Sequence, residues 1–256
     1  MTSRIGRSVG LLSLAAINAL MPAASHAAAA ENCTVPVAER AVALNEIQNL
    51  VGRYDHLGTL RGEGTLANLF ALNTEGVSWL TPGGPVGIAA MKARFEDPDE
   101  DRRPGILHMH SMFSPIIEIA GDGKTAKGVW DSFGPSIQGP DDIGSWLWVK
   151  YAVDFTKEEG KWKIWHLRVY PVFNTKFSTP ITQTAREMNA KQGGPGVAGV
   201  SGRDSARAGP NAGQARPGYV MPGKIWRYDG KSSPQGPFIP EPYCHFDPAT
   251  AYTADK

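Results

Sequence analysis

The chain has 256 residues, with 26 Lys or Arg against 25 Asp or Glu, so its formal net charge at pH 7 is only +1. This balance excludes the strongly basic surface that a general nucleic-acid-binding protein needs. The length is enough for one domain with a sizeable core and some extensions. We therefore expect no nucleic-acid partner.

Residues 1–27 have the pattern of a cleavable secretory signal peptide. Arg4 and Arg7 form a short positive region, a mostly apolar run follows from residue 9 to residue 20, and Ser25-His26-Ala27 fits a cleavage site. The alternative is an uncleaved membrane anchor, but the run is shorter than the roughly 20 residues of a spanning helix. We expect an exported protein, periplasmic or secreted, with no membrane span after cleavage.

The chain contains two cysteines, Cys33 and Cys244, near opposite ends of the expected mature protein. In an oxidising compartment, a disulfide between them would tie the two tails together. Two free thiols, or a bond between subunits, fit the sequence as well, because a sequence does not give the Cα separation.

Helix signals dominate the first half of the mature chain. Apolar residues at three- and four-residue spacing predict a helix over residues 37–60. We expect a second short helix at 65–72, a strand at 77–80 and, after a turn rich in Pro and Gly, a third helix at 86–95.

Strand signals follow. We expect four strands, at about 106–119, 124–134, 145–156 and 161–173. Gly-containing turns at 121–123 and 158–160 would join consecutive strands as hairpins. Helices first and an antiparallel meander second predict an α+β fold.

The composition changes beyond residue 180. Residues 181–218 are predicted to be a flexible linker, because their Gly- and Ala-rich part offers too little apolar surface to offset the ordering entropy. Residues 219–256 regain aromatic residues and prolines, which predicts an extended arm docked on its own subunit or on a neighbour. The predicted organisation is a signal peptide at 1–27, an N-terminal segment at 28–37, a folded domain at 38–180, the linker at 181–218 and the arm at 219–256.

The last strand carries two different faces. Strict alternation places Trp162, Ile164, His166, Arg168 and Tyr170 on one face, which changes from apolar to polar along the strand. We expect this face to line a pocket, with its polar end toward the opening. The alternative is that His166 and Arg168 face solvent, since alternation does not tell which face is inside.

Four motifs together carry a resemblance to a known family. They are Arg53-Tyr54-Asp55-His56, His108-Met109-His110-Ser111, the segment 115–119 and the segment 160–166. In this order and spacing they resemble the SnoaL-like branch of the nuclear transport factor 2-like superfamily over about residues 38–178. The resemblance implies a cone-shaped, curved antiparallel sheet packed on about three helices, with an apolar pocket inside and, here, an extended C-terminal arm.

The resemblance also implies a type of chemistry. Members include scytalone and bile-acid dehydratases, ketosteroid isomerase, polyketide cyclases and formaldehyde lyases acting on lignin-derived diarylpropanes, while other members only bind ligands. We expect a cofactor-independent lyase that uses acid–base elimination on a small hydroxylated aromatic or polycyclic substrate. The reaction would be loss of water, or loss of formaldehyde from a lignin-derived diaryl propanediol. The alternatives are a non-catalytic ligand-binding protein and an isomerase or cyclase, because fold alone does not decide function. The resemblance further implies a homodimer.

The expected catalytic residues are Tyr54, Asp55, His110, His166 and Arg168. His110 matches the active-site histidine of the dehydratases, Tyr54 would donate to a developing oxyanion, and Arg168 would bind an anionic or phenolate group. Asp55 resembles the carboxylate of the Tyr-Asp pair in scytalone dehydratase, although an exposed helix residue is an equal alternative.

The chain departs from the bile-acid dehydratases at Thr59, where those enzymes carry an aspartate. If the chemistry needs a carboxylate from this helix, Asp55 must therefore supply it. The expected substrate-binding residues are His108, Trp79, Trp130, Asp131, Tyr151 and Tyr170. Three histidines at 108, 110 and 166 would also suit zinc, but no carboxylate or Cys joins them at a recognisable spacing, so we expect neither a metal nor a cofactor.

Overall fold

The computed structural model describes residues 33–60, 66–81, 84–96, 105–109, 111–192, 228, 230 and 236–254. The predicted signal peptide and most of the predicted linker lie outside these residues. Within them, no helix combines the length and the apolar character needed to cross a membrane.

The first helix forms where the periodicity predicts it. α1 (Val37–Leu60) buries Ile47, Leu50, Val51 and Tyr54 along one stripe. These positions recur every three or four residues, so they share one face of the helix. The expected second helix is a single 3-10 turn, η2 (Leu66–Leu69), and the third is α2 (Ile88–Glu96).

Seven strands form one curled sheet in the order β2-β1-β7-β6-β5-β3, and β4 also pairs with β5. The strands are β1 (Ser78–Thr81), β2 (Gly84–Val86), β3 (Ile106–His108), β4 (Met112–Ile119), β5 (Thr125–Gln138), β6 (Ser145–Glu158) and β7 (Lys161–Lys176). The predicted meander is correct for β4 to β7, but the sheet is mixed because β1 joins β7 in parallel.

Local backbone chemistry explains the sharp connections in this sheet. Glu159 and Gly160 have φ values of 52° and 74° and join the paired residues Glu158 and Lys161. A two-residue hairpin with both central residues at positive φ matches the twist of the flanking strands. The predicted turn at 158–160 is therefore confirmed.

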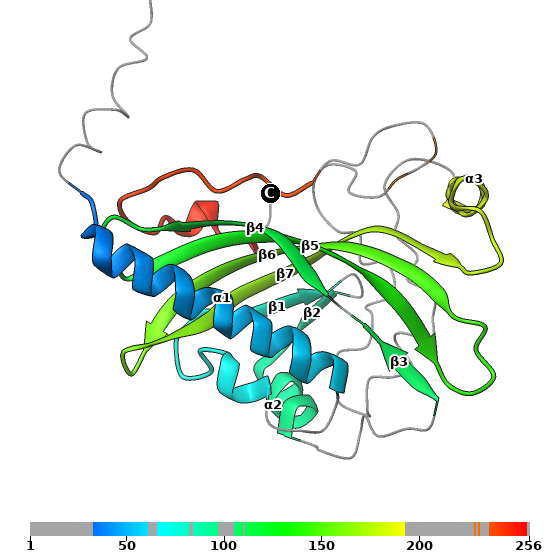
Figure 1. Ribbon diagram of the computed structural model, residues 1–256, viewed down its shortest axis with the longest axis horizontal. Helices are drawn as coiled ribbons and strands as arrows, with labels where there is room; N and C mark the ends of the chain where they lie inside the picture. The colour runs from blue at the N-terminus through cyan, green and yellow to red at the C-terminus, as the bar shows by residue number, and fades with distance from the viewer. Residues whose placement is uncertain are drawn as a thin grey trace, which may run out of the picture.

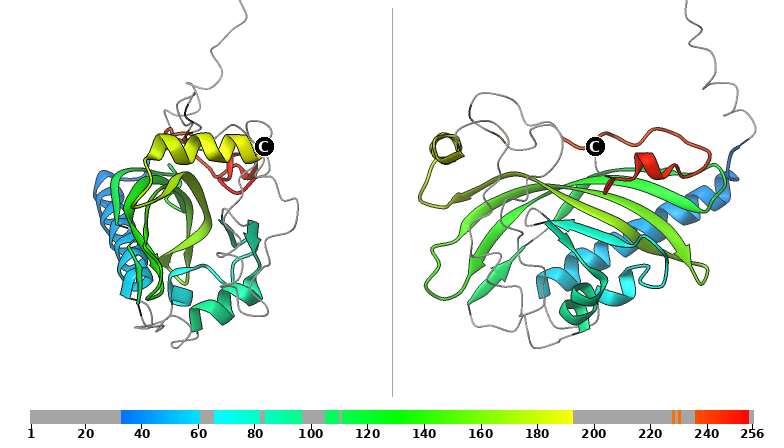
Figure 2. Two further views of the ribbon diagram at one scale, coloured as in Figure 1. Left: turned by 90° about the vertical axis from the view of Figure 1, so that its right-hand side faces the viewer. Right: turned by 180° about the vertical axis from the view of Figure 1, so that it is seen from behind.

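The two sides of the sheet are covered differently (Figures 1 and 2). α1, η2 and α2 lie along the inner side, where one large apolar core joins α1 and η2 to β4–β7. The C-terminal segment runs along the outer side, where a smaller cluster contains Ala152, Tyr170 and Tyr252. This architecture agrees with the predicted α+β cone.

The predicted linker begins too early. Residues 181–192 form α3 (Ile181–Gln192), which packs beside the end of β7. Ala185 is buried, and the hydroxyl groups of Thr184 and Thr175 are 2.6 Å apart. This stretch contains several residues that favour a helix, and the helix is further stabilised by its contact with β7. Together these effects outweigh the low apolar content that predicted a linker.

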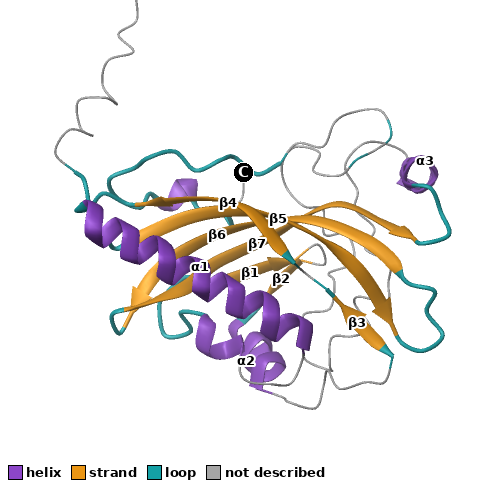
Figure 3. Ribbon diagram, in the orientation of Figure 1, coloured by secondary structure: helices purple, strands orange, loops and turns teal. Residues whose placement is uncertain are grey.

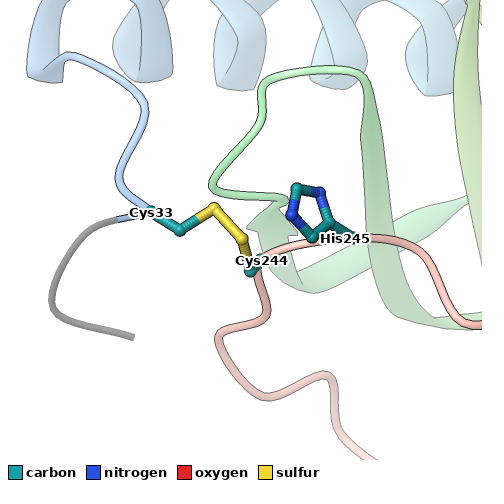
Figure 4. A group of neighbouring side chains, drawn as sticks. All are labelled: Cys33, Cys244 and His245. Atoms are coloured by element: carbon teal, nitrogen blue, oxygen red, sulfur yellow. A yellow bond between two sulfur atoms is a disulfide. The ribbon is translucent and has the colours of Figure 1, made fainter. Parts of the chain in front are cut away.

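The C-terminal segment 236–254 has little regular structure apart from η3 (Pro248–Thr250) and follows the outer face of the sheet (Figure 3). A disulfide joins Cys244 in this segment to Cys33, just before α1, with a Cα–Cα distance of 5.5 Å (Figure 4). The intramolecular bond is thus the correct alternative among those that the sequence left open. The arm docks on its own chain.

Candidate functional site

Trp165 interrupts the alternation that the sequence predicts for β7. Asp154 on β6 pairs with His166, whereas its neighbour Phe155 pairs with Ile164, so Trp165 is an extra residue on β7. A bulge of this kind shifts the side-chain alternation by one position. Ile164 therefore belongs to the inner core, while His166 lies on the outer face with Asp154.

The single shared face predicted for residues 162 to 170 is consequently wrong. Trp162 belongs to the inner core. Arg168 and Tyr170 instead point to the outer side, where both donate to the carbonyl oxygen of Tyr252 in the C-terminal segment. Leu167 and Val169, expected on the opposite face from Ile164, join it in the inner core.

Several of the predicted aromatic residues do meet on the inner side. The ring centroids of Tyr54 and Tyr151 are 6.0 Å apart, and the two rings meet edge to face. The ring centroid of Phe70 lies 6.2 Å from that of Tyr54, also edge to face. Trp79 packs against Phe70 at 6.4 Å. Tyr54 and Tyr151 are only 9% and 3% exposed, so their phenols are held in a mostly apolar surrounding.

Trp130 and Asp131 point to opposite sides of β5, as adjacent strand residues must. Trp130 lies in the inner core against Phe155. Asp131 is on the outer side, where it accepts hydrogen bonds from Trp148 Nε1 at 3.0 Å and Lys150 Nζ at 2.7 Å. The structure therefore does not bring Asp131 to the expected substrate side.

Polar side chains gather where β3 meets β5. His108 Nδ1 and Ser136 Oγ are within hydrogen-bonding distance, at 3.4 Å, and Gln138 Nε2 donates to the same hydroxyl group. Ser136 is buried, on the same side of β5 as Trp130. Within the described residues, Gln138 Oε1 is buried and has no hydrogen-bond partner. A buried acceptor of this kind can receive a hydrogen bond from a ligand.

Asp55 lies near the same region. Its Oδ2 atom accepts the backbone N–H of Met112 at 3.3 Å, so the carboxylate ties the end of α1 to the start of β4. His110 itself lies outside the described residues, so its predicted role stays a prediction.

A buried ionic cluster occupies the outer side of the sheet. Lys127 Nζ lies 2.7 Å from Asp154 Oδ1, and His166 Nδ1 lies 2.9 Å from Asp154 Oδ2. All three residues are buried, and they occupy facing positions on β5, β6 and β7. The C-terminal segment completes this cluster, because Lys127 also donates to Thr250 O and Tyr252 N–H donates to Asp154.

The tyrosines of the outer side stay neutral over a wide pH range. Burial raises the pKa of Tyr170 to about 12, and the positive charge of Arg168 only partly opposes it. Burial likewise raises the pKa of Tyr243 and of Tyr252. Their hydroxyl groups therefore act as hydrogen-bond donors rather than as ionised bases.

The structure separates two of the three histidines that the sequence offers as zinc ligands. His108 lies on the inner side and His166 on the outer side of the sheet, so these two cannot share an ion. Among the described residues, the one close group of His, Cys and carboxylate ligands is Cys33, Cys244 and His245, and both of its sulfur atoms belong to the disulfide.

Sequence reasoning missed Lys127 and Asp154. Each is a charged residue between small or apolar neighbours in the interior of a long strand: Ala126 and Gly128, and Val153 and Phe155. Such isolated charges are a usable signal, because a buried charge needs a partner. The partners themselves come from strands and an arm that are distant in sequence.

Comparison with known proteins gave one family match. A family model described as SnoaL-like domain matches residues 39–168, about half of the chain. The comparison with curated proteins found no match.

Several solved structures are similar to part of this chain. A protein assigned as a scytalone dehydratase from Novosphingobium aromaticivorans is 17% identical, covers 57% of this chain and 95% of its own, and has a TM-score of 0.46. The hexachlorocyclohexane dehydrochlorinase LinA-type3 from Novosphingobium barchaimii is 16% identical, with 56% and 95% coverage and a TM-score of 0.46. A nuclear transport factor 2-like superfamily protein from Salmonella enterica is 16% identical, with 55% and 99% coverage and a TM-score of 0.45.

Proposed function

The chain belongs to the SnoaL-like domain family, and from this premise we propose that it is a cofactor-independent lyase for a small hydroxylated aromatic or polycyclic molecule. The proposed site lies on the inner side of the sheet, between the end of α1 and β3. The observation that carries the proposal is the combination of a buried aromatic cluster with the His108, Ser136 and Gln138 group. The amide oxygen of Gln138 is buried and has no hydrogen-bond partner in the described part of the chain. Flat apolar substrates suit such a lining, and a few polar groups orient them.

In this proposal each residue on the inner side has a separate role. Tyr54 donates its phenolic hydrogen to an oxygen that becomes negative during the reaction. A histidine of the 108–110 segment transfers the proton, and Gln138 Oε1 accepts a substrate hydroxyl group. Asp55 accepts Met112 N–H at the start of β4, and in this proposal it acts as a positioning residue.

The proposed reaction is a proton-assisted elimination. A base removes a proton from the carbon next to the one that bears the hydroxyl group, and the C–H electron pair becomes the new carbon–carbon double bond. The hydroxyl group leaves with a proton from the acid as water. In a diaryl propanediol with a para-phenol, the phenol would first lose its proton while the benzylic hydroxyl group leaves as water, which gives a quinone methide. A base would then take the proton of the terminal hydroxyl group, and the bond to the hydroxymethyl carbon would break to release formaldehyde. The electron pair of that bond would form the new carbon–carbon double bond as the quinone methide returns to a phenol.

The proposed location is a periplasm or the outside of the cell. The Cys33–Cys244 disulfide supports it, because structural disulfides persist in oxidising compartments. A homodimer is also part of the proposal. Phe133 and Trp146 stack on each other at 5.2 Å and remain 39% and 41% exposed, which offers an apolar contact surface.

The test is turnover of phenolic diols, followed by the ultraviolet absorbance of a conjugated product and by mass spectrometry. We expect Tyr54→Phe to lower kcat by roughly 10²- to 10³-fold, the usual effect of losing one oxyanion donor. Tyr243→Phe is the matched control, because its hydroxyl group meets Thr125 in the contact between the arm and the sheet, and kcat should not change. Equal rates for the wild type and a folded Tyr54→Phe variant would remove Tyr54 from the site.

The same assay separates the alternatives. Saturable binding of the diol with no product would favour a ligand-binding protein, which the largely apolar inner cluster also fits. A product of unchanged mass would indicate an isomerase or a cyclase.

A further inference from the structure

We propose that reduction of the Cys33–Cys244 disulfide creates a zinc-binding site, formed by the two cysteine thiolates and the imidazole of His245. These three side chains lie together where the segment before α1 meets the C-terminal segment (Figure 4). The proposed lyase site lies at the other end of α1, on the inner side of the sheet, so the two proposals can fail independently.

The three side chains are close enough to bind one ion. A ring nitrogen of His245 and the sulfur atoms of Cys33 and Cys244 all lie within 4.8 Å of one another. Zinc lies about 2.3 Å from sulfur and about 2.0 Å from an imidazole nitrogen, so the ligand atoms of a tetrahedral site are about 3.6–3.8 Å apart. Once the bond between the sulfur atoms is broken, rotation of the cysteine side chains brings them to this separation. A water molecule would complete the four ligands.

The carboxylate of Asp122 orients the histidine. His245 Nδ1 lies 3.0 Å from Asp122 Oδ2, and Asp122 Oδ1 accepts the N–H group of Lys124 at 3.0 Å, so both carboxylate oxygens are held. When the Nδ1 hydrogen is donated to Asp122, Nε2 keeps the lone pair that a metal needs. Histidines that bind zinc commonly donate their other N–H group to a carboxylate, which fixes the ring and raises the basicity of the ligand nitrogen.

The β4–β5 turn positions the ligands through contacts that do not depend on the disulfide. The N–H groups of Gly121 and Asp122 donate to Tyr243 O and Cys244 O at 2.8 and 3.1 Å, which places the start of the Cys244–His245 pair on this turn. Cys33 lies against the same turn, so closely that a Cβ atom at Gly121 would be 2.0 Å from Cys33 O. Reduction itself removes none of these contacts. The ligands are therefore largely preorganised, which lowers the entropic cost of binding.

The disulfide and the zinc ion use the same two sulfur atoms, so the two forms exclude each other. A dithiol reductant would transfer two electrons and two protons to the disulfide and become a disulfide itself. Zn²⁺ would then displace the two thiol protons and bind the thiolates. The side chain of His245 is 73% exposed, so solvent reaches the site. In the reduced chain the ion would link Cys33 to the arm in place of the disulfide.

The experiment measures zinc binding by the full chain in its oxidised and reduced forms. The protein is reduced with dithiothreitol, desalted without oxygen and titrated with Zn²⁺ in competition with a chromophoric chelator. The chain has two cysteines, so the charge-transfer absorbance of a cobalt–thiolate bond, measured with Co²⁺ as a second probe, reports on this pair alone. We expect one Zn²⁺ per reduced chain. The oxidised chain, which has lost both thiolate ligands, should bind more than roughly 100-fold more weakly, beyond the effect of losing a ligand's hydrogen-bond partner.

Single substitutions test the assigned ligands in the reduced chain. His245→Ala should also weaken binding more than roughly 100-fold, whereas Asp122→Asn should weaken it roughly 10- to 100-fold, the usual effect of losing the partner of a metal ligand. His56→Ala is the matched control, because His56 lies near the end of α1 that is distant from Cys33. This variant should bind Zn²⁺ as tightly as the wild type.

Two results would overturn the proposal: no stoichiometric binding to the reduced wild type, or equal affinities of the reduced wild type and the His245→Ala variant. If the reduced chain unfolds without metal, Zn²⁺ should restore the circular dichroism spectrum of the oxidised protein, because binding to the folded state stabilises it. The chain with Cys33→Ser and Cys244→Ser should gain nothing from Zn²⁺. An unfolded wild type that does not recover, or equal recovery of the double variant, would equally overturn the proposal.

Discussion

At the scale of single residues, Lys127 shows how the outer face stabilises the protein. Its ammonium group contacts Asp154 and Thr250 O, and the side chains of Lys127 and Asp154 are 5% and 0% exposed. We expect Lys127→Met to lower the free energy of unfolding by roughly 3–5 kcal/mol, because it leaves a buried carboxylate without its main partner. Urea unfolding at pH 7 measures this loss.

Lys150→Met is the matched control for that change. Lys150 also forms a 2.7 Å ion pair with an aspartate on the outer side, but the side chains of Lys150 and Asp131 are 30% and 22% exposed. Water screens such a pair, so the expected loss is about 0–1 kcal/mol. Similar losses for the two variants would contradict the view that burial makes the Lys127 pair important.

Tyr170 predicts a dependence of stability on alkaline pH. Its pKa is raised from 10 to about 12, so the folded chain keeps the phenolic proton longer than the unfolded chain. The stabilising contribution is therefore complete below pH 10 and is lost as the pH rises toward 12. We expect the free energy of unfolding to fall by up to ~1.4 kcal/mol per pH unit from this group. Tyr170→Phe should make the fall shallower in urea titrations between pH 9 and 11.5, and an unchanged slope would contradict the assignment.

The sequence places some candidate residues correctly and misplaces others, for a reason visible residue by residue. Tyr54 and Tyr151 point inward because each follows an unbroken helical or strand period through apolar neighbours. His166 and Arg168 follow the extra residue Trp165, which shifts the alternation, so their side chains point outward. No local sequence pattern predicts this extra residue.

At the scale of elements, Gly128 leaves room on the inner face of β5 for the side chain of Trp130, two residues further along the strand. A Cβ atom at Gly128 would overlap the ring of Trp130, which in turn packs against Phe155. We expect Gly128→Ala to destabilise the fold by about 1–3 kcal/mol, because the tryptophan ring must leave its place in the core. Thermal unfolding followed by circular dichroism measures the change.

Gly52→Ala is the comparison for the same substitution on α1. A Cβ atom there has no neighbour within 4 Å, and alanine favours a helix interior more than glycine. The expected effect is a gain of about 0.4–1 kcal/mol. If the two variants change the free energy of unfolding in opposite directions, packing around the glycine determines the effect of the substitution. A stabilised Gly128→Ala variant would contradict this explanation.

The elements with strong local signals form where the sequence predicts them. Those that depend on pairing with distant strands differ from the prediction. The period of α1 and the turn at Glu159 and Gly160 follow from local chemistry alone. The expected strand 106–119 is instead divided into β3 and β4, and β4 carries a bulge at Ser114, whose φ is 52°. β3 pairs with the end of β5, a partner that only the folded sheet supplies.

At the scale of the whole molecule, the disulfide closes nearly the entire described chain. Cys33 and Cys244 are 211 positions apart, so the bond restricts a very long loop in the unfolded state. We expect Cys33→Ser with Cys244→Ser to lower the free energy of unfolding by roughly 5 kcal/mol, the value that the entropic model of cross-linking gives for a loop of this length. Urea unfolding under non-reducing conditions checks this, with the reduced wild type as a second measure. A stability equal to that of the oxidised wild type would contradict the expected contribution.

Local periods, turns and motifs in the amino-acid sequence are enough to predict the α+β class, the family, the first helix, the hairpins and the inward aromatic residues. The sequence also supplied the two cysteines, but not their bond. The folded chain was needed to assign His166 and Arg168 to one face of β7, to show that Lys127 and Asp154 form a buried pair, and to show that the arm covers its own sheet. The physical reason is register: one extra residue in a strand reverses every following side chain, and pairing between distant strands, not the strand's own pattern, decides where that residue goes.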